Sequence, residues 1–307
     1  MTDTHDILNE LNSIPSEAIN SASEHIDLMS TVEVLQCINE QDALVAPAVS
    51  KAIPDISKAV DVAVDCLKDG GRLIYIGAGT SGRLGILDAV ECRPTFSVSD
   101  NIVVGLIAGG EKALIHAVEG AEDDSNAAQQ DLENIQFSKK DMLIGLAASG
   151  RTPYVIGALR FANSLNATTA CIVCNPQAPL IDIADIGICA NVGPEVLTGS
   201  TRMKSGTAQK LILNMISTAS MIKLGKTYKN LMVDVNATNQ KLLARAIRIV
   251  MQATDCEESV AVEALAISNN NAKLAILKIL TNNDIDTCEN LLKKSDGFLR
   301  AALDSNQ

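Results

Sequence analysis

Short apolar runs alternate with segments of helical periodicity through the middle of the chain, starting at about Leu73. The runs are RLIYIG, NIVVGLIAGG, DMLIGLAASG, ATTACIVCN and DIGICANV. They lack a strict alternation of apolar and polar positions, which is typical of strands that are buried on both faces. Helical segments between consecutive strands favour parallel pairing, because a parallel pair needs a long crossover connection. The pattern predicts an α/β fold in which helices cover both faces of a parallel sheet.

Helical periodicity without strand candidates flanks this central region. Before it, residues 31–68 predict two or three helices, which Pro54 bends or divides and which end at Gly70-Gly71. A helix of about 20 residues, SGTAQKLILNMISTASMIKLG, follows the last predicted strand, and after about Asn239 only short helical segments remain. We therefore divide the chain into an N-terminal helical segment (1–60), a central α/β domain (61–226) and a small all-α C-terminal domain (227–307).

The composition limits the classes of partner. The 307 residues include no Trp, three Tyr and four Phe, so the core must be built from aliphatic side chains. The scarcity of aromatic side chains also leaves few platforms on which nucleic-acid bases could stack. The formal net charge of −12 repels a phosphate backbone. We expect no nucleic-acid partner, although a helix N-terminus can still bind a small anion locally.

Hydropathy and cysteine usage give no sign of a membrane or of secretion. No run of about 18 apolar residues occurs, and the polar first ten residues do not resemble a signal peptide. Of eight scattered cysteines, only Cys171 and Cys174 form a C-x-x-C pair. Residues three apart point to opposite faces of a strand, so we interpret this pair as buried thiols rather than a metal or redox site. These features predict a cytoplasmic protein with no membrane partner.

A glycine-rich loop follows the first predicted strand. In LIYIGAGTSGRLG, the residues Gly77, Gly79 and Gly82 spell G-x-G-x-x-G, the fingerprint of dinucleotide-binding folds. Such a site also needs an acidic residue at the end of the next strand, where it binds the ribose. The nearest candidate, Asp100, instead precedes that strand. The sequence therefore disfavours a dinucleotide and favours a smaller ligand at this loop.

The same kind of corner occurs twice, as Ser81-Gly82-Arg83 and again as Ser149-Gly150-Arg151. Backbone N–H groups at helix starts, together with Ser and Thr hydroxyls, can bind the oxygens of a phosphate monoester. Ser and Thr also cap helices in many proteins, and one corner alone would favour that interpretation. Two matching corners at the carboxyl ends of parallel strands can converge on one phosphate, which favours a phosphate site. Its candidate residues are Gly79, Thr80, Ser81, Gly82, Ser149, Gly150 and Thr152.

Several longer segments resemble one known family. The segments LIYIGAGTSGRLGILDAVEC, GLIAGGEKALIHAVEGAEDD, AASGRTPYVIGAL, TGSTRMKSGTAQKLILNMIS and NLMVDVNATNQKL are similar to parts of N-acetylmuramic acid 6-phosphate etherases. The family carries a sugar isomerase (SIS) domain, a flavodoxin-like three-layer αβα fold that binds phosphosugars through Ser- and Thr-rich loops. The resemblance runs from about Ser23 to beyond Lys241, and GSTRMKSGTAQK is its most specific part. The related glucokinase regulatory protein has two SIS units in a much longer chain, whereas this chain has room for one.

The resemblance implies a carbon–oxygen lyase of cell-wall amino-sugar recycling. Members of the family convert N-acetylmuramic acid 6-phosphate into N-acetylglucosamine 6-phosphate and D-lactate, by elimination followed by addition of water. No redox step, cofactor or metal enters this chemistry. The C-terminal helices resemble a small three-helix, ubiquitin-associated-like module. Because several helices carry more Ile, Val and Ala than one small core needs, we also expect a homodimer.

Two glutamates are the candidate acid and base of this reaction. The resemblance places the acid for the departing lactate oxygen at Glu91, in LDAVECRPTF, and the base for the C2 proton at Glu122, in HAVEGAEDD. Spacing alone cannot choose them among 37 acidic residues, since Asp88 and Glu119 lie three positions before each. We expect partial burial to raise the pKa of Glu91 and keep it protonated. Arg93 stands where the family commonly has proline, and we expect its side chain to point outward.

Three basic residues are further candidates. Lys204, in GSTRMKSG, is expected to bind the phosphosugar through its phosphate or its lactyl carboxylate, and Arg202 could do the same. Both side chains could instead bind backbone carbonyls or a neighbouring subunit. His116 lies among apolar neighbours on a predicted helix, and we interpret it as a packed or partly exposed side chain rather than a base.

Two rival functions follow from the same residues. An aldose–ketose isomerase of phosphosugars also needs a base at C2, and release of lactate would distinguish the etherase from it. A non-catalytic phosphosugar sensor would need neither Glu91 nor Glu122, and it would normally carry a domain that binds DNA or a kinase. The C-terminal helices lack an obvious basic recognition helix, which disfavours a repressor. Whether a neighbouring subunit completes the site is a question for the structure.

Overall fold

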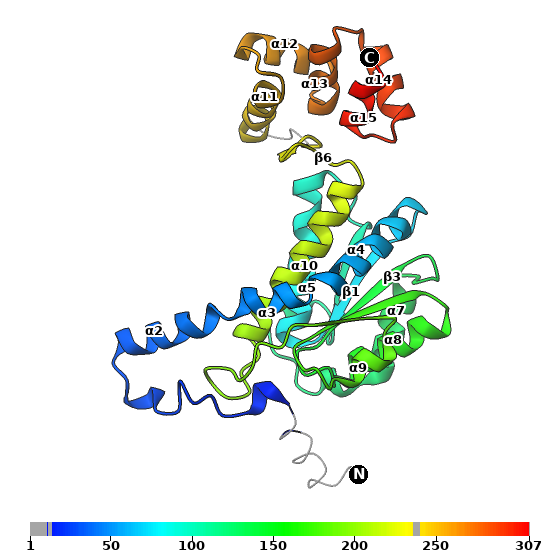
Figure 1. Ribbon diagram of the computed structural model, residues 1–307. Helices are drawn as coiled ribbons and strands as arrows, with labels where there is room; N and C mark the ends of the chain where they lie inside the picture. The colour runs from blue at the N-terminus through cyan, green and yellow to red at the C-terminus, as the bar shows by residue number, and fades with distance from the viewer. Residues whose placement is uncertain (1–10, 12–13, 236–239, 307) are drawn as a thin grey trace. The chain divides into compact units, whose positions relative to one another are not determined.

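The computed structural model describes residue 11, residues 14–235 and residues 240–306 of the chain (Figure 1). Contacts divide the chain into two compact units, one of residues 1–90 and 101–217 and the other of residues 91–100 and 218–307. The helices α5 (Gly79–Phe96) and α10 (Lys204–Lys223) therefore contribute residues to both units. The three-part division drawn from the sequence remains a prediction.

The five apolar runs form one parallel sheet, as predicted. Its strand order is β2-β1-β3-β4-β5. The strands are β1 (Leu73–Gly77), β2 (Val103–Ile107), β3 (Met142–Leu146), β4 (Thr168–Val173) and β5 (Ile186–Cys189). All residues of β1 and β3 are buried, which explains why these strands show no alternation of apolar and polar positions.

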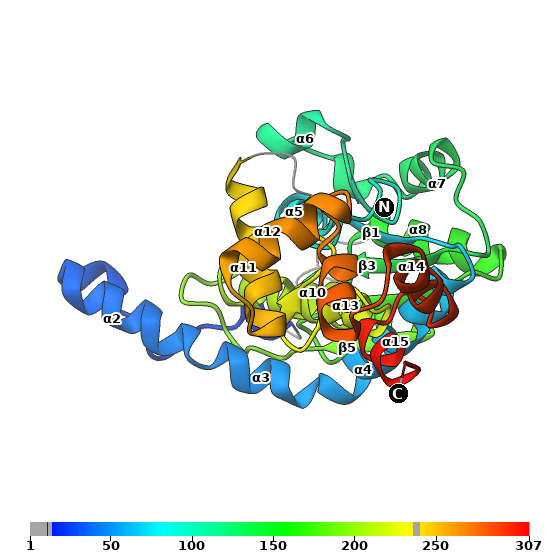
Figure 2. The ribbon, with the colours of Figure 1, turned by 90° about the horizontal axis from the view of Figure 1, so that it is seen from above.

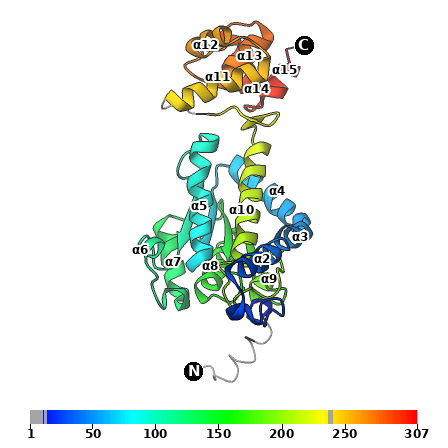
Figure 3. The ribbon, with the colours of Figure 1, turned by 90° about the vertical axis from the view of Figure 1, so that its left-hand side faces the viewer.

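Helices cover both faces of the sheet, which confirms the three-layer αβα architecture. On one face, Ile74 and Ile76 of β1 pack with α7 (Ser125–Asn134), α8 (Pro153–Ser164) and the residues that begin α9 (Pro179–Ile183). Tyr75 points to the opposite face, because successive strand residues alternate in direction, and there it approaches Gly85 of α5. The helices α4 (Ile53–Lys68) and α10 lie on the same side as α5 (Figure 3).

The N-terminal segment consists of short turns and three helices. The 3-10 turns η1 (Pro15–Glu17) and η2 (Ile26–Leu28) precede α2 (Thr31–Asp42), α3 (Val45–Lys51) and α4. Ser30 and Glu33 form a capping box at the start of α2. Pro54 divides α3 from α4 and lies in the first turn of α4, where a missing N–H is tolerated. Helix α2 extends away from the sheet (Figure 2).

The second unit is built mainly from the C-terminal helices. They are α11 (Gln240–Thr254), α12 (Glu258–Ile267), α13 (Ala272–Thr281), α14 (Ile285–Lys294) and α15 (Leu299–Asp304). Their apolar faces form one core of mainly Ala, Ile, Leu and Val side chains. The described residues thus hold five helices here, where the sequence predicted only short helical segments, and the likeness to a ubiquitin-associated module remains a prediction. An antiparallel hairpin of β6 (Thr227–Tyr228) and β7 (Leu231–Met232) was not predicted, because two-residue strands leave no periodic pattern.

A hydrogen-bonded ion pair joins the loops that enter β1 and β3. The guanidinium of Arg72 donates from Nε to Oδ1 of Asp141 at 3.0 Å and from Nη2 to Oδ2 at 2.9 Å. The backbone N–H of Arg72 also donates to Oδ1, and that of Ser138 donates to Oδ2. Burial raises the pKa of the Asp141 carboxyl, but these bonds outweigh burial and leave the pKa below its ordinary value.

Replacing Asp141 by asparagine is expected to destabilise the protein by about 2 to 3 kcal/mol, because it leaves the Arg72 guanidinium without its carboxylate. A lowered folded-state pKa stabilises the protein above the unfolded-state pKa, and this contribution is lost as pH falls through the folded-state value. Denaturant unfolding over a range of pH should therefore show a smaller loss of stability in acid for Asp141→Asn than for the wild type. Equal stability of the two proteins at neutral pH would contradict the assigned role.

Candidate active site

The carboxyl ends of β1 and β3 meet at a point where the chain leaves the sheet in opposite directions. Gly77 of β1 pairs with Leu146 of β3, while β1 connects onward to β2 and β3 connects onward to β4. Open α/β sheets bind their ligands in the crevice at such a switch point. The two Ser-Gly-Arg corners follow these two strands, so the structure places them side by side, as the sequence predicted.

The first corner is a tight turn from β1 into α5. Gly79 begins the helix with a φ of +52°, which a glycine adopts without strain. A Cβ on Gly82 would lie 2.7 Å from the carbonyl oxygen of Gly77, so the strand and the helix can approach this closely only without a side chain there. Ser81 Oγ donates to Oε1 of Gln209 on α10 at 2.8 Å. The corner therefore carries its hydroxyl group on a rigid backbone.

The second corner leads from β3 into α8. Gly150 has a φ of +69°, and a Cβ on it would lie 2.2 Å from that of Ala178. Ser149 Oγ accepts from the N–H of Arg151 at 3.3 Å. Thr152 is the N-cap residue of α8, yet its side chain makes no capping hydrogen bond. For Thr152, helix capping therefore does not explain the hydroxyl group, which favours the phosphate interpretation of this corner.

The first turn of α10 forms a third side of this region. Glu195 is fully buried and accepts from the N–H groups of Lys204 and Ser205 and from Ser205 Oγ, at 2.7 to 3.0 Å. The Sγ of Cys174, just past β4, lies 3.8 Å from the carbonyl oxygen of Ser205. A Cβ on Gly206 of α10 would lie 3.5 Å from the methyl group of Thr80. The start of α10 thus lies against the first corner.

The side chain of Lys204, the first residue of α10, contacts the N-terminal segment. Its side chain is buried, and its Nζ donates to Oε1 of Gln41 on α2 at 3.0 Å. The same oxygen accepts from Nδ2 of Asn20 at 2.9 Å. Burial lowers the pKa of the Lys204 ammonium, although the carboxylates of Glu195 and Asp42 oppose this shift. This position joins the N-terminal segment to α10 and gives no support to the prediction that Lys204 binds the phosphosugar.

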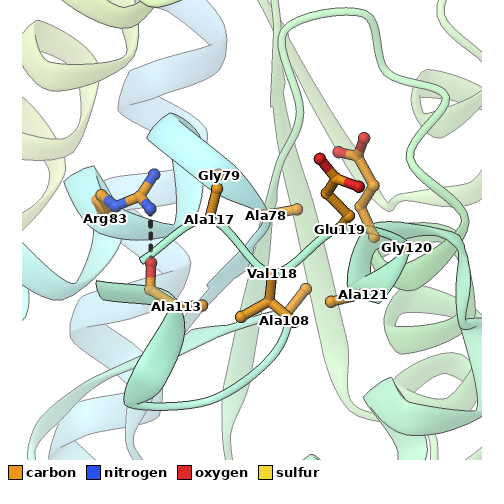
Figure 4. Close-up of a pocket in the computed structure, with 11 residues that line it drawn as sticks. Ala78, Gly79, Arg83, Ala108, Ala113, Ala117, Val118, Glu119, Gly120 and Ala121 are labelled. Carbon is orange, nitrogen blue, oxygen red and sulfur yellow. Dashed lines mark hydrogen bonds between the residues drawn. The ribbon is translucent and has the colours of Figure 1, made fainter. Parts of the chain in front are cut away.

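A cavity of about 230 Å³ opens beside the first corner (Figure 4). It lies between the start of α5, the end of β2 and the segment 117–122. The carboxylates of Glu119 and Glu122 and the guanidinium of Arg83 are its charged groups. The predicted base, Glu122, thus lies on the cavity that the glycine loop borders. His116 is exposed and does not line this cavity. The remaining lining residues are Ala78, Gly79, Ala108, Ala113, Ala117, Val118, Gly120 and Ala121.

The predicted acid, Glu91, lies farther along α5 and is exposed. The sequence predicted that the Glu91 side chain is partly buried, and this prediction is wrong for one chain by itself. Leu87 and Val90 of the same helix are also exposed, by 51% and 63%, so the described residues leave this surface of α5 uncovered. Arg93 forms an ion pair with Asp100 at 2.7 Å, with both side chains about two-thirds exposed, so it points outward as expected.

Two buried polar residues of this region, Glu195 and Gln209, were not predicted from the sequence. Glu195 accepts hydrogen bonds at the start of α10, and Gln209 accepts one from the first corner. Nothing in their local sequence marks them as buried partners.

No helix in the described parts of the chain is long and apolar enough to cross a membrane. Among those same residues, no group of three or more His, Cys, Asp and Glu side chains could hold a metal ion.

Family models match most of the chain. Residues 55–163 match the N-terminal SIS domain of glucokinase regulatory protein, and residues 118–219 match the SIS domain. Residues 229–287 match the C-terminal lid domain of glucokinase regulatory protein. The described fold of the first unit agrees with these matches, because it has the parallel sheet and the two covering layers of helices.

Curated relatives match nearly the whole chain. The N-acetylmuramic acid 6-phosphate etherase of Pseudoalteromonas atlantica is 60% identical over 301 residues, which cover 98% of each chain. Those of Vibrio campbellii and Brucella anthropi are 58% and 54% identical and cover 95% and 98% of each chain. Solved phosphoheptose isomerases from Francisella tularensis and Neisseria gonorrhoeae cover 62% of this chain and 98% and 97% of their own. Their TM-scores are 0.47 and 0.46, at 17% and 14% identity.

Proposed function

The chain belongs to the N-acetylmuramic acid 6-phosphate etherase family, and from this membership we infer that it cleaves the D-lactyl ether of N-acetylmuramic acid 6-phosphate. The products are N-acetylglucosamine 6-phosphate and D-lactate, so the enzyme is a carbon–oxygen lyase. Relatives that are 54 to 60% identical over nearly their whole length carry this conclusion. Incubation with the substrate should release one D-lactate per sugar. A ketose product without lactate would indicate the rival isomerase, and binding without turnover would indicate the sensor.

The ether can be cleaved under mild conditions because it lies β to the aldehyde of the open-chain sugar. The aldehyde acidifies the C2 proton, and once a base removes that proton, the electron pair forms a C2=C3 double bond while the C3–O bond breaks. An acid gives its proton to the departing lactate oxygen. The same group then takes a proton from water as the water adds at C3 and the proton returns to C2. The sugar is neither oxidised nor reduced.

We place the phosphate at the two Ser-Gly-Arg corners. The adjacent carboxyl ends of β1 and β3 support this position, as does the hydroxyl group of Thr152, which makes no capping bond. Gln209 supplies a further argument, because its Nε2 is buried without a hydrogen-bond partner among the described residues. If its amide is turned over, Nε2 donates to Ser81 Oγ, and the hydroxyl hydrogen of Ser81 becomes available to a phosphate oxygen.

Replacing Ser81 and Ser149 together by alanine is expected to raise KM about 10- to 100-fold, because two hydrogen bonds to a charged phosphate are lost. Steady-state release of D-lactate over a range of substrate concentrations measures this change. A matched control is Ser164→Ala, since the Ser164 hydroxyl donates only to a backbone carbonyl of its own helix, at the far end of α8. An unchanged KM in the double variant would rule out a phosphate site at these corners.

Glu122 is the proposed base at C2. It lines the cavity that begins at Gly79, so a sugar whose phosphate lies at the first corner can bring C2 toward this carboxylate. Glu122 belongs to the turn η3 (Ala121–Asp123), which follows Gly120 with its φ of +75°. Glu119 also lines the cavity, and the family resemblance is what distinguishes the two carboxylates. The cavity thus supports the position of the base, and the resemblance supports its identity.

Glu91 is the proposed acid, and we place it in the site of a second copy of the chain. Twelve residues of α-helix separate Gly79 from Glu91, a rise of about 18 Å, which exceeds the length of a hexosamine phosphate. This separation favours a role for Glu91 in the site of another copy over a role at the start of its own helix. In a two-fold symmetric dimer, each copy can supply Glu91 to the other, which gives two equivalent sites.

The proposed homodimer is supported by apolar side chains that the single chain leaves exposed. Contiguous exposed apolar surface is typical of protein interfaces. Leu87 and Val90 lie four and one positions before Glu91 on α5, so an interface over them would also cover the proposed acid. Such burial would raise the pKa of a carboxyl group, as the acid role requires. The larger exposed side chains outside α5 include Ile19, Leu28, Val32, Leu35 and Ile115.

The cytoplasmic location also remains a proposal. All eight cysteines are free thiols, which fits a reducing compartment. Cys171 and Cys174 are buried, as predicted, and burial raises the pKa of each thiol to about 12. Both therefore stay protonated near neutral pH, which agrees with their interpretation as core residues.

A further inference from the structure

Arg83 is the one basic residue among those that line the cavity beside the first corner. It lies on α5, one turn past the start of the helix. Its Nε donates to the carbonyl oxygen of Leu114 at 3.1 Å. Its Nη2 donates to the carbonyl oxygen of Ala113 at 2.6 Å, as Figure 4 shows. These two bonds fix the plane of the guanidinium, and neither of them uses Nη1. The cavity therefore has an oriented cation in its wall.

The charge of the cavity makes this cation significant. Glu119 and Glu122 also line it, and the chain as a whole has a net charge of −12. An anionic group that enters such a cavity is repelled unless a positive group compensates for the two carboxylates. The substrate of the proposed reaction carries two anionic groups, the phosphate and the carboxylate of the lactyl ether. The Ser-rich corners can bind the phosphate, which leaves the carboxylate in need of a partner.

We propose that Arg83 binds the lactyl carboxylate of the substrate and thereby selects the lactyl ether over the unsubstituted sugar. The proposal rests on the etherase function and adds the residue that recognises the leaving group. A guanidinium is suited to this role because it keeps its charge and binds carboxylates in its own plane. Its bonds to Ala113 and Leu114 position it in advance, so little side-chain freedom is lost when the substrate binds.

The alternative role of Arg83 is structural, since both of its bonds join α5 to α6 (Lys112–Ile115). The two roles make different predictions for a substrate without the carboxylate. A purely structural arginine affects all ligands of the cavity alike. An arginine that contacts the carboxylate affects only the ligands that carry it.

The test compares N-acetylmuramic acid 6-phosphate with its lactamide analogue, in which a neutral amide replaces the carboxylate. Arg83→Gln should lower kcat/KM for the natural substrate about 10- to 100-fold. The same variant should leave kcat/KM for the lactamide analogue within about twofold of the wild type. Lys112→Gln removes one positive charge from an exposed position nearby and should change neither value. Arg83→Lys, which keeps the charge, should recover part of the loss.

An equal loss for both substrates would overturn the proposal and assign Arg83 a structural role. Calorimetric binding of both compounds to Glu122→Gln, with and without Arg83→Gln, gives a readout that does not depend on turnover. Arg83→Gln should weaken the binding of N-acetylmuramic acid 6-phosphate but not that of its lactamide analogue. Equal weakening of both compounds would contradict the proposal. A wild-type protein that binds the substrate but releases no D-lactate would instead overturn the proposed etherase function. The two failures are therefore distinguishable.

Discussion

Replacing Glu122 by glutamine is expected to abolish both release of D-lactate and exchange of the C2 proton with solvent. The amide has nearly the shape of the carboxylate but cannot accept the proton, so the first chemical step fails. A positioned general base typically contributes about 10²- to 10⁴-fold, and kcat should fall by at least that factor. Deuterium incorporation at C2 in heavy water, followed by mass spectrometry, measures this step without any need for turnover.

Glu119 provides the matched control for this prediction. It lines the same cavity three residues earlier, and Glu119→Gln removes the same charge from the same wall. We expect this variant to keep C2 exchange and to change kcat far less than Glu122→Gln does. If Glu119→Gln lost exchange while Glu122→Gln kept it, the base would have to be reassigned to Glu119.

Replacing Glu91 by glutamine is expected to separate the two halves of the elimination. The base at C2 remains, so the variant should still exchange the C2 proton with solvent deuterium. The departing lactate oxygen has no proton donor, so release of D-lactate should fall by about 10²- to 10⁴-fold. A misfolded protein would lose both activities. A variant that still exchanges the C2 proton but no longer releases D-lactate must therefore be folded.

Asp100→Asn is the control for this variant. Asp100 is an exposed carboxylate that forms an ion pair with Arg93. Arg93 lies two positions beyond Glu91, and no step of the proposed reaction uses Asp100. We expect normal lactate release from it. Full turnover by Glu91→Gln would remove Glu91 from the mechanism and leave the acid to be found among other residues.

The sequence predicted the sheet and the two corners because both depend on short segments. A strand that is buried on both faces needs an apolar run whatever lies around it, so LIYIG and MLIGL were recognisable by themselves. The Ser-Gly-Arg corners were recognisable because the same turn occurs twice. Parallel strands then placed the corners at one edge of the sheet, although the strand order that makes them neighbours was visible only in the structure.

The parts that the sequence did not predict depend on residues far apart in the chain. The Lys204 ammonium binds Gln41, which lies 163 positions earlier, and no local pattern could have identified that partner. The buried carboxylate of Glu195 likewise lies in a segment, GPEVL, whose composition does not distinguish a buried residue from a surface one. Glu91 was expected to be partly buried from its small and apolar neighbours, but two of these, Leu87 and Val90, are themselves exposed.

The position of the acid is the central claim of this account, and a mixed dimer tests it most directly. Glu91→Gln and Glu122→Gln chains that carry different affinity tags can be expressed together, and dimers that contain one of each can be purified through both tags. If each site combines Glu91 of one copy with Glu122 of the other, a mixed dimer has one intact site and one doubly substituted site. It should then release D-lactate at about half the wild-type rate, although both parent dimers are inactive. A mixed dimer as inactive as its parents would show that no site combines the two glutamates across copies and would contradict the account.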